Sequence, residues 1–469
     1  MELDIDEYTG ELSWLDRTAL AALRVVPGNQ TLGVSERSLL AIRGSTWAIA
    51  GYGGSQLLRL AAQLVLARML LGPQAFGLVA LVSVFLSGLE LLSDLGVGTD
   101  VIQHPRGDDP VFMNTAFLVQ AGRGLILWAI AAALAYPFAS FYHQPLVRSM
   151  ILVAAISVGL RGFASSSIWT MTRHVQIAKL TALNLGGDFA GFVVALVWAI
   201  LSPTAWALVV GRVAGSAVYV IGSHLLSEHP VSWDWDSKAA RDIFIFGAGM
   251  FVSSATYFLA GEAERLVIGK FITLAELGCF SLALALSWGP SRAVQQVISQ
   301  VFFPMIAKDL REDRSAATRD YRRVRILLVA MSSVLSCGFI LFGPFAVHIL
   351  LGPKYADAGW MLQLLGFRAA LELFSSATTA MLFAVGVSSY SAVGNVAKLS
   401  FLSVGLAIAF SRFGFREAVW VLALSQLANY VPQLWGLVKR FKPTLRIEIV
   451  CFALFLGSAV LAALLAATI

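Results

Sequence analysis

Charge is scarce in this sequence. Only 13% of its 469 residues are Asp, Glu, Lys or Arg, whereas soluble domains average about 25%. Hydrophobic residues make up 58% of the chain and the mean hydropathy is +0.76. Because the shortage recurs along the whole chain, a soluble globular protein is excluded. Apolar runs of about 20 residues predict membrane-spanning helices instead.

Cysteine is also scarce. Cys279, Cys337 and Cys451 lie far apart, each within an apolar run. This spacing excludes a disulfide framework and a CxxC metal site, so we expect the three thiols to pack as small hydrophobic groups. Residues 1–16 are acidic and polar, unlike a signal peptide, so we expect the first span to direct insertion.

Catalytic motifs are lacking as well. The six histidines show no HExxH spacing, and the chain contains no P-loop and no Gly-rich dinucleotide turn. We therefore predict no catalytic residue, no metal site and no cofactor. Long external loops, on which a membrane glycosyltransferase or polymerase would place its chemistry, are missing from the predicted topology. These absences favour a transporter driven by an ion gradient or by the disequilibrium of its substrate.

Apolar windows predict thirteen spans in two sets. The first set lies near 44–70, 76–96, 112–137, 146–166, 181–201 and 204–226. The second lies near 242–261, 275–300, 324–350, 359–385, 390–410, 416–437 and 447–467. Because thirteen is odd, either the last span is an extra helix or one segment is split or merged, and we favour the extra helix. The predicted parts are a cytoplasmic segment 1–43, an N-lobe 44–226, a linker 227–241, a C-lobe 242–437 and an extra C-terminal helix 438–469.

The positions of the basic residues orient this topology. With residues 1–43 placed in the cytoplasm, inside loops and the adjoining parts of the spans hold 21 of the 34 Lys and Arg, their outside counterparts hold 6, and 7 arginines are assigned to the spans themselves. By the positive-inside rule the N-terminus is cytoplasmic. The net charge of +6 reflects this topology and indicates no nucleic-acid partner. The densest inside loop, Lys308–Arg325, is predicted to face anionic lipids.

A faint internal repeat supports two six-helix halves. Residues 68–80 have a cation, a short turn, Gly77 and a new apolar span, and residues 270–282 repeat this order around Gly278. Because both turns face outside, the repeat would be parallel, with its axis along the membrane normal. Chance similarity between two helical hairpins is the alternative.

Several segments resemble a known family. LLGPQAFGLVAL (70–81) and SDLGVGTDVIQ (93–103) are similar to the start of bacterial polysaccharide transporters of the Wzx and WzxC kind, relatives of the MATE multidrug-efflux proteins. The likeness continues in AERLVIGKFITLAELGCFSLALAL (263–286), VFFPMIAKDL (301–310) and LLGPKYADAGWMLQLLG (350–366). The family often has Asp where this chain has Glu264. The resemblance covers about residues 38–440, and its motifs mark the fold better than the cargo.

The resemblance implies an all-α polytopic membrane protein, with about twelve to thirteen helices here, in two six-helix lobes around a central cavity. It implies a flippase of the bacterial inner membrane that moves an undecaprenyl-diphosphate-linked oligosaccharide by alternating access for exopolysaccharide, capsule or O-antigen assembly. Membrane lipids, a polysaccharide polymerase with its export machinery, and Na⁺ or H⁺ are the implied partners. A MATE-type exporter of drugs or small solutes is the alternative.

Charges inside the spans are the chemical feature that stands out, because an ionisable group in hydrocarbon is costly and usually functional. All seven cations are arginines, and a guanidinium binds phosphate bidentately without losing its charge. The acids are fewer: Glu90, Asp94, Asp188 and Glu372. A lipid diphosphate requires such cations, whereas a cationic drug would require an acidic cavity.

The seven arginines differ in position. Arg59, Arg123 and Arg212 lie nearest the middle of their spans, so we predict that they bind substrate, with a buried structural ion pair, for instance with Asp188, as the alternative. Arg292, which follows Pro290, and Arg368 are further candidates, although Arg368 can pair with Glu372 four residues on. Arg68 and Arg161 lie near span ends, where snorkelling explains them.

Two carboxylates are candidates for ion coupling. Asp188 directly follows the helix-thinning pair Gly186-Gly187, and Glu264 is predicted near the outer mouth. Small residues of this kind permit either close helix packing or bending.

Overall fold

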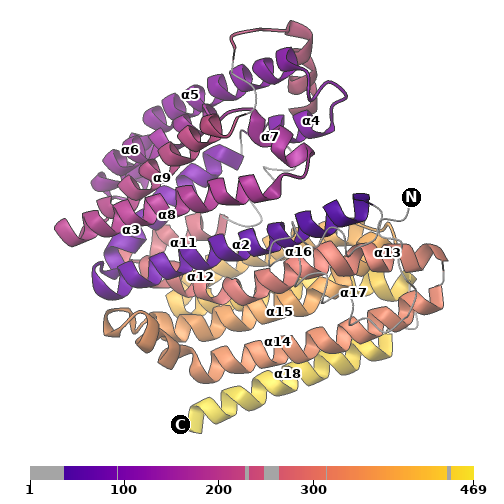
Figure 1. Ribbon diagram of the computed structural model, residues 1–469. Helices are drawn as coiled ribbons and strands as arrows, with labels where there is room; N and C mark the ends of the chain where they lie inside the picture. The colour runs from indigo at the N-terminus through magenta and orange to yellow at the C-terminus, as the bar shows by residue number, and fades with distance from the viewer. Residues whose placement is uncertain are drawn as a thin grey trace, which may run out of the picture. The chain divides into compact units, whose positions relative to one another are not determined.

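The computed structural model describes residues 36–91, 93, 95–227, 232–247, 263–312, 314–440 and 445–468. Within these residues all regular structure is helical, as predicted (Figure 1). The helices are α2 (Glu36–Met69), α3 (Pro73–Leu91), α4 (Val97–Gln103), α5 (Pro110–Phe141), α6 (Pro145–Gly162), α7 (Ser167–Arg173), α8 (Ile177–Leu201), α9 (Trp206–Leu225), a helix over 237–247, α11 (Ala263–Phe271), α12 (Leu274–Val297), a π-helix (Ile298–Phe302), α13 (Phe303–Glu312), α14 (Arg314–Leu350), a 3₁₀ turn (Pro353–Tyr355), α15 (Ala358–Ala384), α16 (Ser389–Arg412), α17 (Phe415–Arg440) and α18 (Leu445–Thr468).

Eight of the described helices are long and apolar enough to cross a membrane: α3, α5, α6, α8, α9, α14, α16 and α18. Each predicted span except 242–261 coincides with one described long helix, and most of 242–261 lies outside the described residues. The all-α polytopic membrane class is therefore confirmed.

Local sequence signals fix where the helices begin. Asp109 caps α5, its Oδ1 accepting a hydrogen bond from the Val111 amide at 3.1 Å, with Pro110 at the first helical position. Thr273 and Glu276 form a capping box at the start of α12, in which each side chain accepts from the other residue's backbone amide.

The chain forms two compact units. Unit 1 comprises residues 1–62, 85–202 and 206–258, and unit 2 comprises 63–84, 203–205 and 259–469. In unit 1, α5 packs on α6, α6 on α9, and α9 on α8 (Figure 1). In unit 2, α14 packs against α15 and α18, and α15 also packs against α12 and α17 (Figure 1). The lobe boundaries that the sequence suggests stay a prediction.

Glycines bring α8 and α9 close together. A Cβ built on Gly191 would lie 2.8 Å from the Gly211 carbonyl oxygen, and one on Gly187 would lie 3.0 Å from that of Gly215. Nothing lies within 4 Å of such an atom on Gly186. Gly187 and Gly191 therefore serve close helix packing, as small residues do between membrane helices.

The basic segment 308–325 differs from its prediction as a lipid-facing loop. Its described residues are helical, and α14 begins at Arg314, well before the apolar window. Arg325 is fully buried and pairs with Glu448 of α18 at 2.5 Å. The prediction of a lipid-facing connector is wrong for Arg325, because its guanidinium pairs with a carboxylate far away in the sequence, which the local charge density does not reveal.

Candidate functional site

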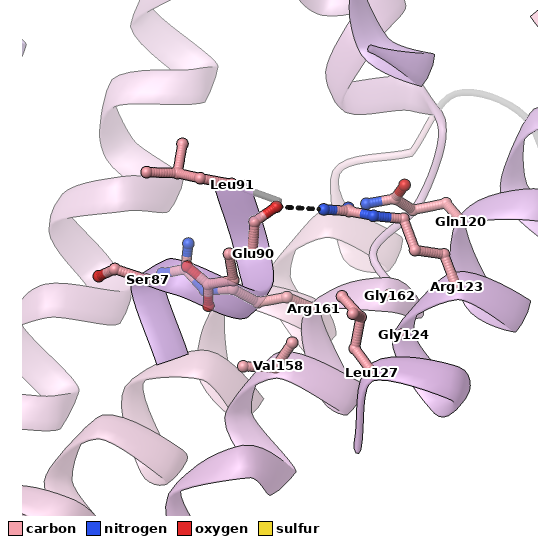
Figure 2. Close-up of a pocket in the computed structure, with 10 residues that line it drawn as sticks. All are labelled: Ser87, Glu90, Leu91, Gln120, Arg123, Gly124, Leu127, Val158, Arg161 and Gly162. Carbon is pink, nitrogen blue, oxygen red and sulfur yellow. Dashed lines mark hydrogen bonds between the residues drawn. The ribbon is translucent and has the colours of Figure 1, made fainter. Parts of the chain in front are cut away.

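A cavity of 440 Å³ lies within unit 1, lined by residues of α3, α5 and α6 (Figure 2). Its size falls within the range of about 300–1,000 Å³ that is usual for small-molecule sites. The lining residues are Ser87, Glu90, Leu91, Gln120, Arg123, Gly124, Leu127, Val158, Arg161 and Gly162. Two of these are arginines, and Glu90 is the one acid among the described lining residues.

Arg123 is fixed at the cavity wall by the C-terminal end of α3. Its Nε donates to the Ser93 carbonyl at 2.7 Å, and its Nη2 donates to the Glu90 carbonyl at 2.8 Å (Figure 2). The last carbonyls of a helix lack intrahelical partners and carry partial negative charge, so a cation is stabilised there. These contacts hold the guanidinium in one orientation beside the cavity.

Arg212 of α9 pairs with the carboxylate of Glu90. Its Nη2 lies 3.2 Å from Glu90 Oε1, and its Nε donates to Ser157 Oγ at 3.1 Å. The two side chains are 36% and 38% exposed, so neither is sealed in the protein interior. The single acid at the cavity is therefore already engaged by a cation.

Arg161 is the third cation of this group. Its guanidinium lies 5.2 Å from the centre of the Tyr219 ring, and its Nε donates to Ser216 Oγ at 3.4 Å. The side chain is exposed and lines the cavity. Arg123, Arg161 and Arg212 with Glu90, named here the arginine cluster, carry net positive charge in a half-open site. Such a site suits an anion with several oxygens.

Packing explains how Arg123 and Arg161 come together. Each directly precedes a glycine, and a Cβ built on Gly124 would lie only 2.9 Å from the Gly162 Cα. The helices α5 and α6 therefore approach each other closely beside the two arginines. The repeated Arg-Gly dipeptide is a sequence signal that points to Arg161 as a cavity residue. The position of Arg161 near a span end predicts an interfacial role instead.

Arg59 does not line this cavity. It pairs with Asp188 of α8, with Nε 3.1 Å from Oδ2. The side chains are 58% and 23% exposed, so the pair is open to its surroundings. The structure thus brings together one predicted substrate-binding arginine and one predicted coupling carboxylate. Asp94 lies outside the described residues.

Arg368 and Arg292 lie in unit 2, outside the arginine cluster. Arg368 pairs with Glu264 at 2.8 Å, and both side chains are almost fully buried. The alternative pairing with Glu372 is wrong, because the partner of Arg368 is Glu264 of another helix. Arg292 is exposed and lies 4.4 Å from the centre of the Trp288 ring, a cation–π contact.

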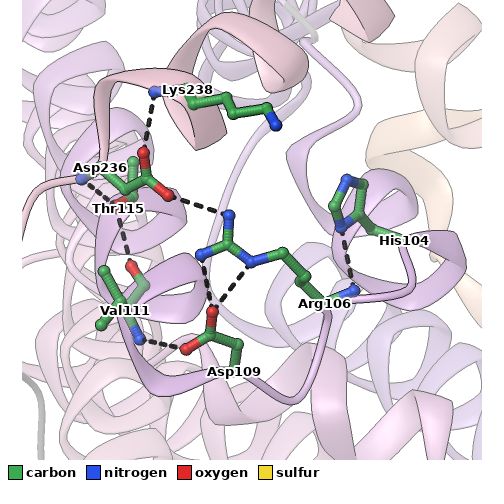
Figure 3. Close-up of polar contacts among 7 residues, drawn as sticks. All are labelled: His104, Arg106, Asp109, Val111, Thr115, Asp236 and Lys238. Atoms are coloured by element: carbon green, nitrogen blue, oxygen red, sulfur yellow. Dashed lines mark hydrogen bonds and ion pairs between the residues drawn. The ribbon is translucent and has the colours of Figure 1, made fainter.

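A second polar group lies in unit 1, in the loop before α5 (Figure 3). Arg106 bonds Asp109 at 2.7 Å and Asp236 at 2.9 Å, and Thr115 Oγ1 accepts from the Asp236 amide at 3.0 Å. The Arg106 guanidinium lowers the pKa of both Asp109 and Asp236. This group, named here the loop clamp, ties the segment that contains Asp236 to the start of α5.

Sequence comparison connects the chain to polysaccharide assembly. A family model described as "Polysaccharide biosynthesis protein" matches residues 65–359. The teichuronic acid biosynthesis protein TuaB of Bacillus subtilis (strain 168) is 19% identical over 74% of this chain and 72% of its own length. The succinoglycan biosynthesis transport protein ExoT of Rhizobium meliloti (strain 1021) is 24% identical over 69% and 65%. The lipopolysaccharide biosynthesis protein WzxC of Escherichia coli (strain K12) is 20% identical over 64% and 61%.

Solved structures show the same fold. The lipid II flippase MurJ in an inward closed conformation superposes with a TM-score of 0.64 at 9% identity, over 90% of this chain and 98% of that one. An inward-facing multidrug resistance MATE transporter of the MOP superfamily gives 0.58 at 16% identity, over 82% and 94%. With a family model that matches residues 65–359 and a MATE-like fold, this chain belongs to the polysaccharide biosynthesis protein family.

Proposed function

We propose that this protein is a flippase that carries a lipid-linked oligosaccharide across the bacterial cytoplasmic membrane by alternating access. Its family and the names of its relatives support a role in exopolysaccharide, capsule or O-antigen assembly. The positive-inside count supports a cytoplasmic N-terminus. In this role the protein moves its substrate unchanged and works beside a polymerase and export machinery.

The arginine cluster carries this proposal. A diphosphate presents several oxygens and at least two negative charges, which fixed guanidinium groups bind through charge-assisted hydrogen bonds. Arg123 and Arg161 line the cavity together with Glu90, and Arg212 pairs with that carboxylate, so three guanidinium groups outnumber one acid. A cationic drug would meet repulsion there, which disfavours a multidrug exporter.

Asp188 is our candidate for ion coupling. Its carboxylate already pairs with Arg59, so Na⁺ or H⁺ binding at Asp188 would release the guanidinium. Glu264 is the second candidate, although its carboxylate is held by the buried Arg368. Asp188→Asn is expected to flatten the dependence of flipping on an imposed Na⁺ or H⁺ gradient, and Asp357→Asn, which alters a loop carboxylate, is the matched control. Unchanged gradient dependence in Asp188→Asn would contradict this role.

A leaflet-flipping assay in proteoliposomes tests the proposed function. The substrate is a fluorescent undecaprenyl-diphosphate-linked oligosaccharide, and Arg123, Arg161 and Arg212 are each changed to Ala. A charge-assisted hydrogen bond contributes about 1.5–3 kcal/mol, so each variant should flip about 10- to 100-fold more slowly at limiting substrate. Arg148→Ala, on the same helix as Arg161 but outside the cavity, is the control. If all three variants flip as fast as the wild type, the arginine cluster does not bind the diphosphate.

A further inference from the structure

Unit 2 contains a second cavity, of 410 Å³, among α12, the π-helix, α15, α16 and α17. Its size is again usual for a small-molecule site. The π-helix Ile298–Phe302 contributes to the wall, and such irregular turns often occur at functional sites. The lining residues are Gln295, Ile298, Ser299, Phe303, Glu372, Ser375, Ser376, Thr379, Ala380, Phe383, Ser391, Asn395, Lys398, Gln426, Asn429 and Gln433.

Amides and hydroxyls dominate this wall. Five lining residues carry side-chain amides and five carry hydroxyls, while Glu372 and Lys398 are the one acid and the one base. Membrane helices need only scattered polar contacts to associate, and further polar side chains in the bilayer are costly. A wall of this composition therefore indicates a polar ligand without net charge.

Part of the wall is held in a fixed arrangement. Gln433 donates to Asn429 Oδ1 at 2.5 Å, Asn429 donates to Asn395 Oδ1 at 2.8 Å, and Thr379 donates to Gln433 Oε1 at 2.7 Å. This chain of bonds links α15, α16 and α17 and sets the direction of each amide. The site would not have to order these side chains when a ligand binds.

Other polar groups of the wall are available to a ligand. The Gln295 amide, the Glu372 carboxylate and the Lys398 ammonium form no hydrogen bond with another described residue. Phe303 and Phe383 add apolar faces to the same wall. Donors, acceptors and aromatic faces together match a sugar ring, which presents hydroxyls at its edge and C–H groups on its faces.

We propose that this cavity binds an uncharged saccharide unit of the substrate. The inference rests on the proposed function, and it adds a site for the sugar to the arginine cluster, which is proposed for the diphosphate. The two sites differ in chemistry, since one carries three arginines with one acid and the other balances one acid against one base. The neutral site contributes selectivity for the glycan, and the cationic site contributes affinity for the lipid diphosphate.

Lipid-binding measurements on the full chain in nanodiscs test this assignment. The probes are undecaprenyl diphosphate and undecaprenyl diphosphate that carries a neutral oligosaccharide of several hexoses, and the readout is the ratio of their dissociation constants. Gln295→Leu removes an available amide without breaking a described hydrogen bond, and Asn395→Leu removes one from the bonded chain. Ser403→Leu, exposed on the same helix as Asn395 and outside the cavity, is the control.

The wild type and Ser403→Leu are expected to prefer the hexose-bearing lipid. Both cavity variants should lose about three- to tenfold of that preference, the effect of one hydrogen bond, and keep their affinity for the plain diphosphate lipid. Equal binding of both lipids by the wild type, or an unchanged preference in both cavity variants, overturns the saccharide site alone. Failure of the wild type to bind either lipid overturns the proposed function and the saccharide site with it.

Discussion

Gly77 of α3 and Gly278 of α12 meet in a reciprocal contact. A Cβ on Gly77 would overlap the Leu274 carbonyl, and a Cβ on Gly278 would overlap the Pro73 carbonyl. Leu274 and Gly278 follow Pro73 and Gly77 at the same sequence offset, which is the offset of the predicted internal repeat. Such reciprocity is what a two-fold axis between the two segments produces. The contact supports the internal repeat itself, for which the sequence similarity alone is faint, and the direction of its axis stays a prediction.

Substitution of either glycine is expected to destabilise the fold. In Gly77→Ala or Gly278→Ala the methyl group meets a backbone carbonyl, which cannot turn aside, so overpacking should cost about 1–3 kcal/mol of unfolding free energy. Gly289→Ala, on the same helix as Gly278 with open space around its Cβ position, should not destabilise. Thermal unfolding in detergent measures the difference, and equal melting of all three variants would contradict the close crossing.

Glu90→Gln is expected to tighten anion binding. The Glu90 carboxylate competes with a diphosphate for Arg212, and its neutralisation leaves that guanidinium to the ligand. Because both side chains are partly exposed, solvent screening limits the gain to about three- to tenfold. Calorimetric titration with inorganic pyrophosphate measures the affinity, with Glu417→Gln in unit 2 as the control. Weaker binding in Glu90→Gln would mean that Glu90 positions the arginine cluster instead of competing for it.

The loop clamp is expected to open in acid. The Arg106 guanidinium lowers the pKa of Asp109 and Asp236 in the folded protein. Their contribution is therefore fully present above the unfolded aspartate value of about 3.9 and is lost as the pH falls through the lower folded values. Amide hydrogen exchange of residues 232–238 should accelerate, beyond its intrinsic pH dependence, only below about pH 4. Arg106→Gln should abolish this acceleration of exchange. If the acceleration persists in Arg106→Gln, groups other than the loop clamp cause it.

The helices could be predicted from the sequence because a bilayer imposes one long apolar run per span. Arg123 and Arg212 stand out in the sequence for a related reason, since a charge near the middle of a span is costly wherever its partner lies. Asp188 was proposed as a partner, and the structure pairs it with Arg59.

The partners themselves could not be predicted. Arg368 pairs with Glu264 and Arg325 with Glu448, at sequence separations that no local rule connects. Arg161 reaches the cavity because Gly124 and Gly162 bring α5 and α6 together, and this depends on the tertiary contact.

The buried pair between Arg325 and Glu448 provides a stringent test of how α18 is attached. Both side chains are fully buried, and Tyr430 adds a hydrogen bond to the Glu448 carboxylate at 2.6 Å. Arg325→Leu or Glu448→Leu leaves the other charge buried without its counter-ion, so each should cost about 3–5 kcal/mol of unfolding free energy. Arg323→Leu, two residues away with 79% of its side chain exposed, should cost under about 1 kcal/mol.

The double variant Arg325→Leu/Glu448→Leu separates the interaction between the two charges from their interactions with the rest of the protein. Because it buries no lone charge, it should be more stable than either single variant, although apolar replacement leaves the Tyr430 hydroxyl without an acceptor. The unfolding free energies of the wild type, the two single variants and the double variant, measured in mixed micelles, form a double-mutant cycle. If the two single losses simply add in the double variant, the charges do not interact, and α18 is held to α14 by its apolar contacts alone.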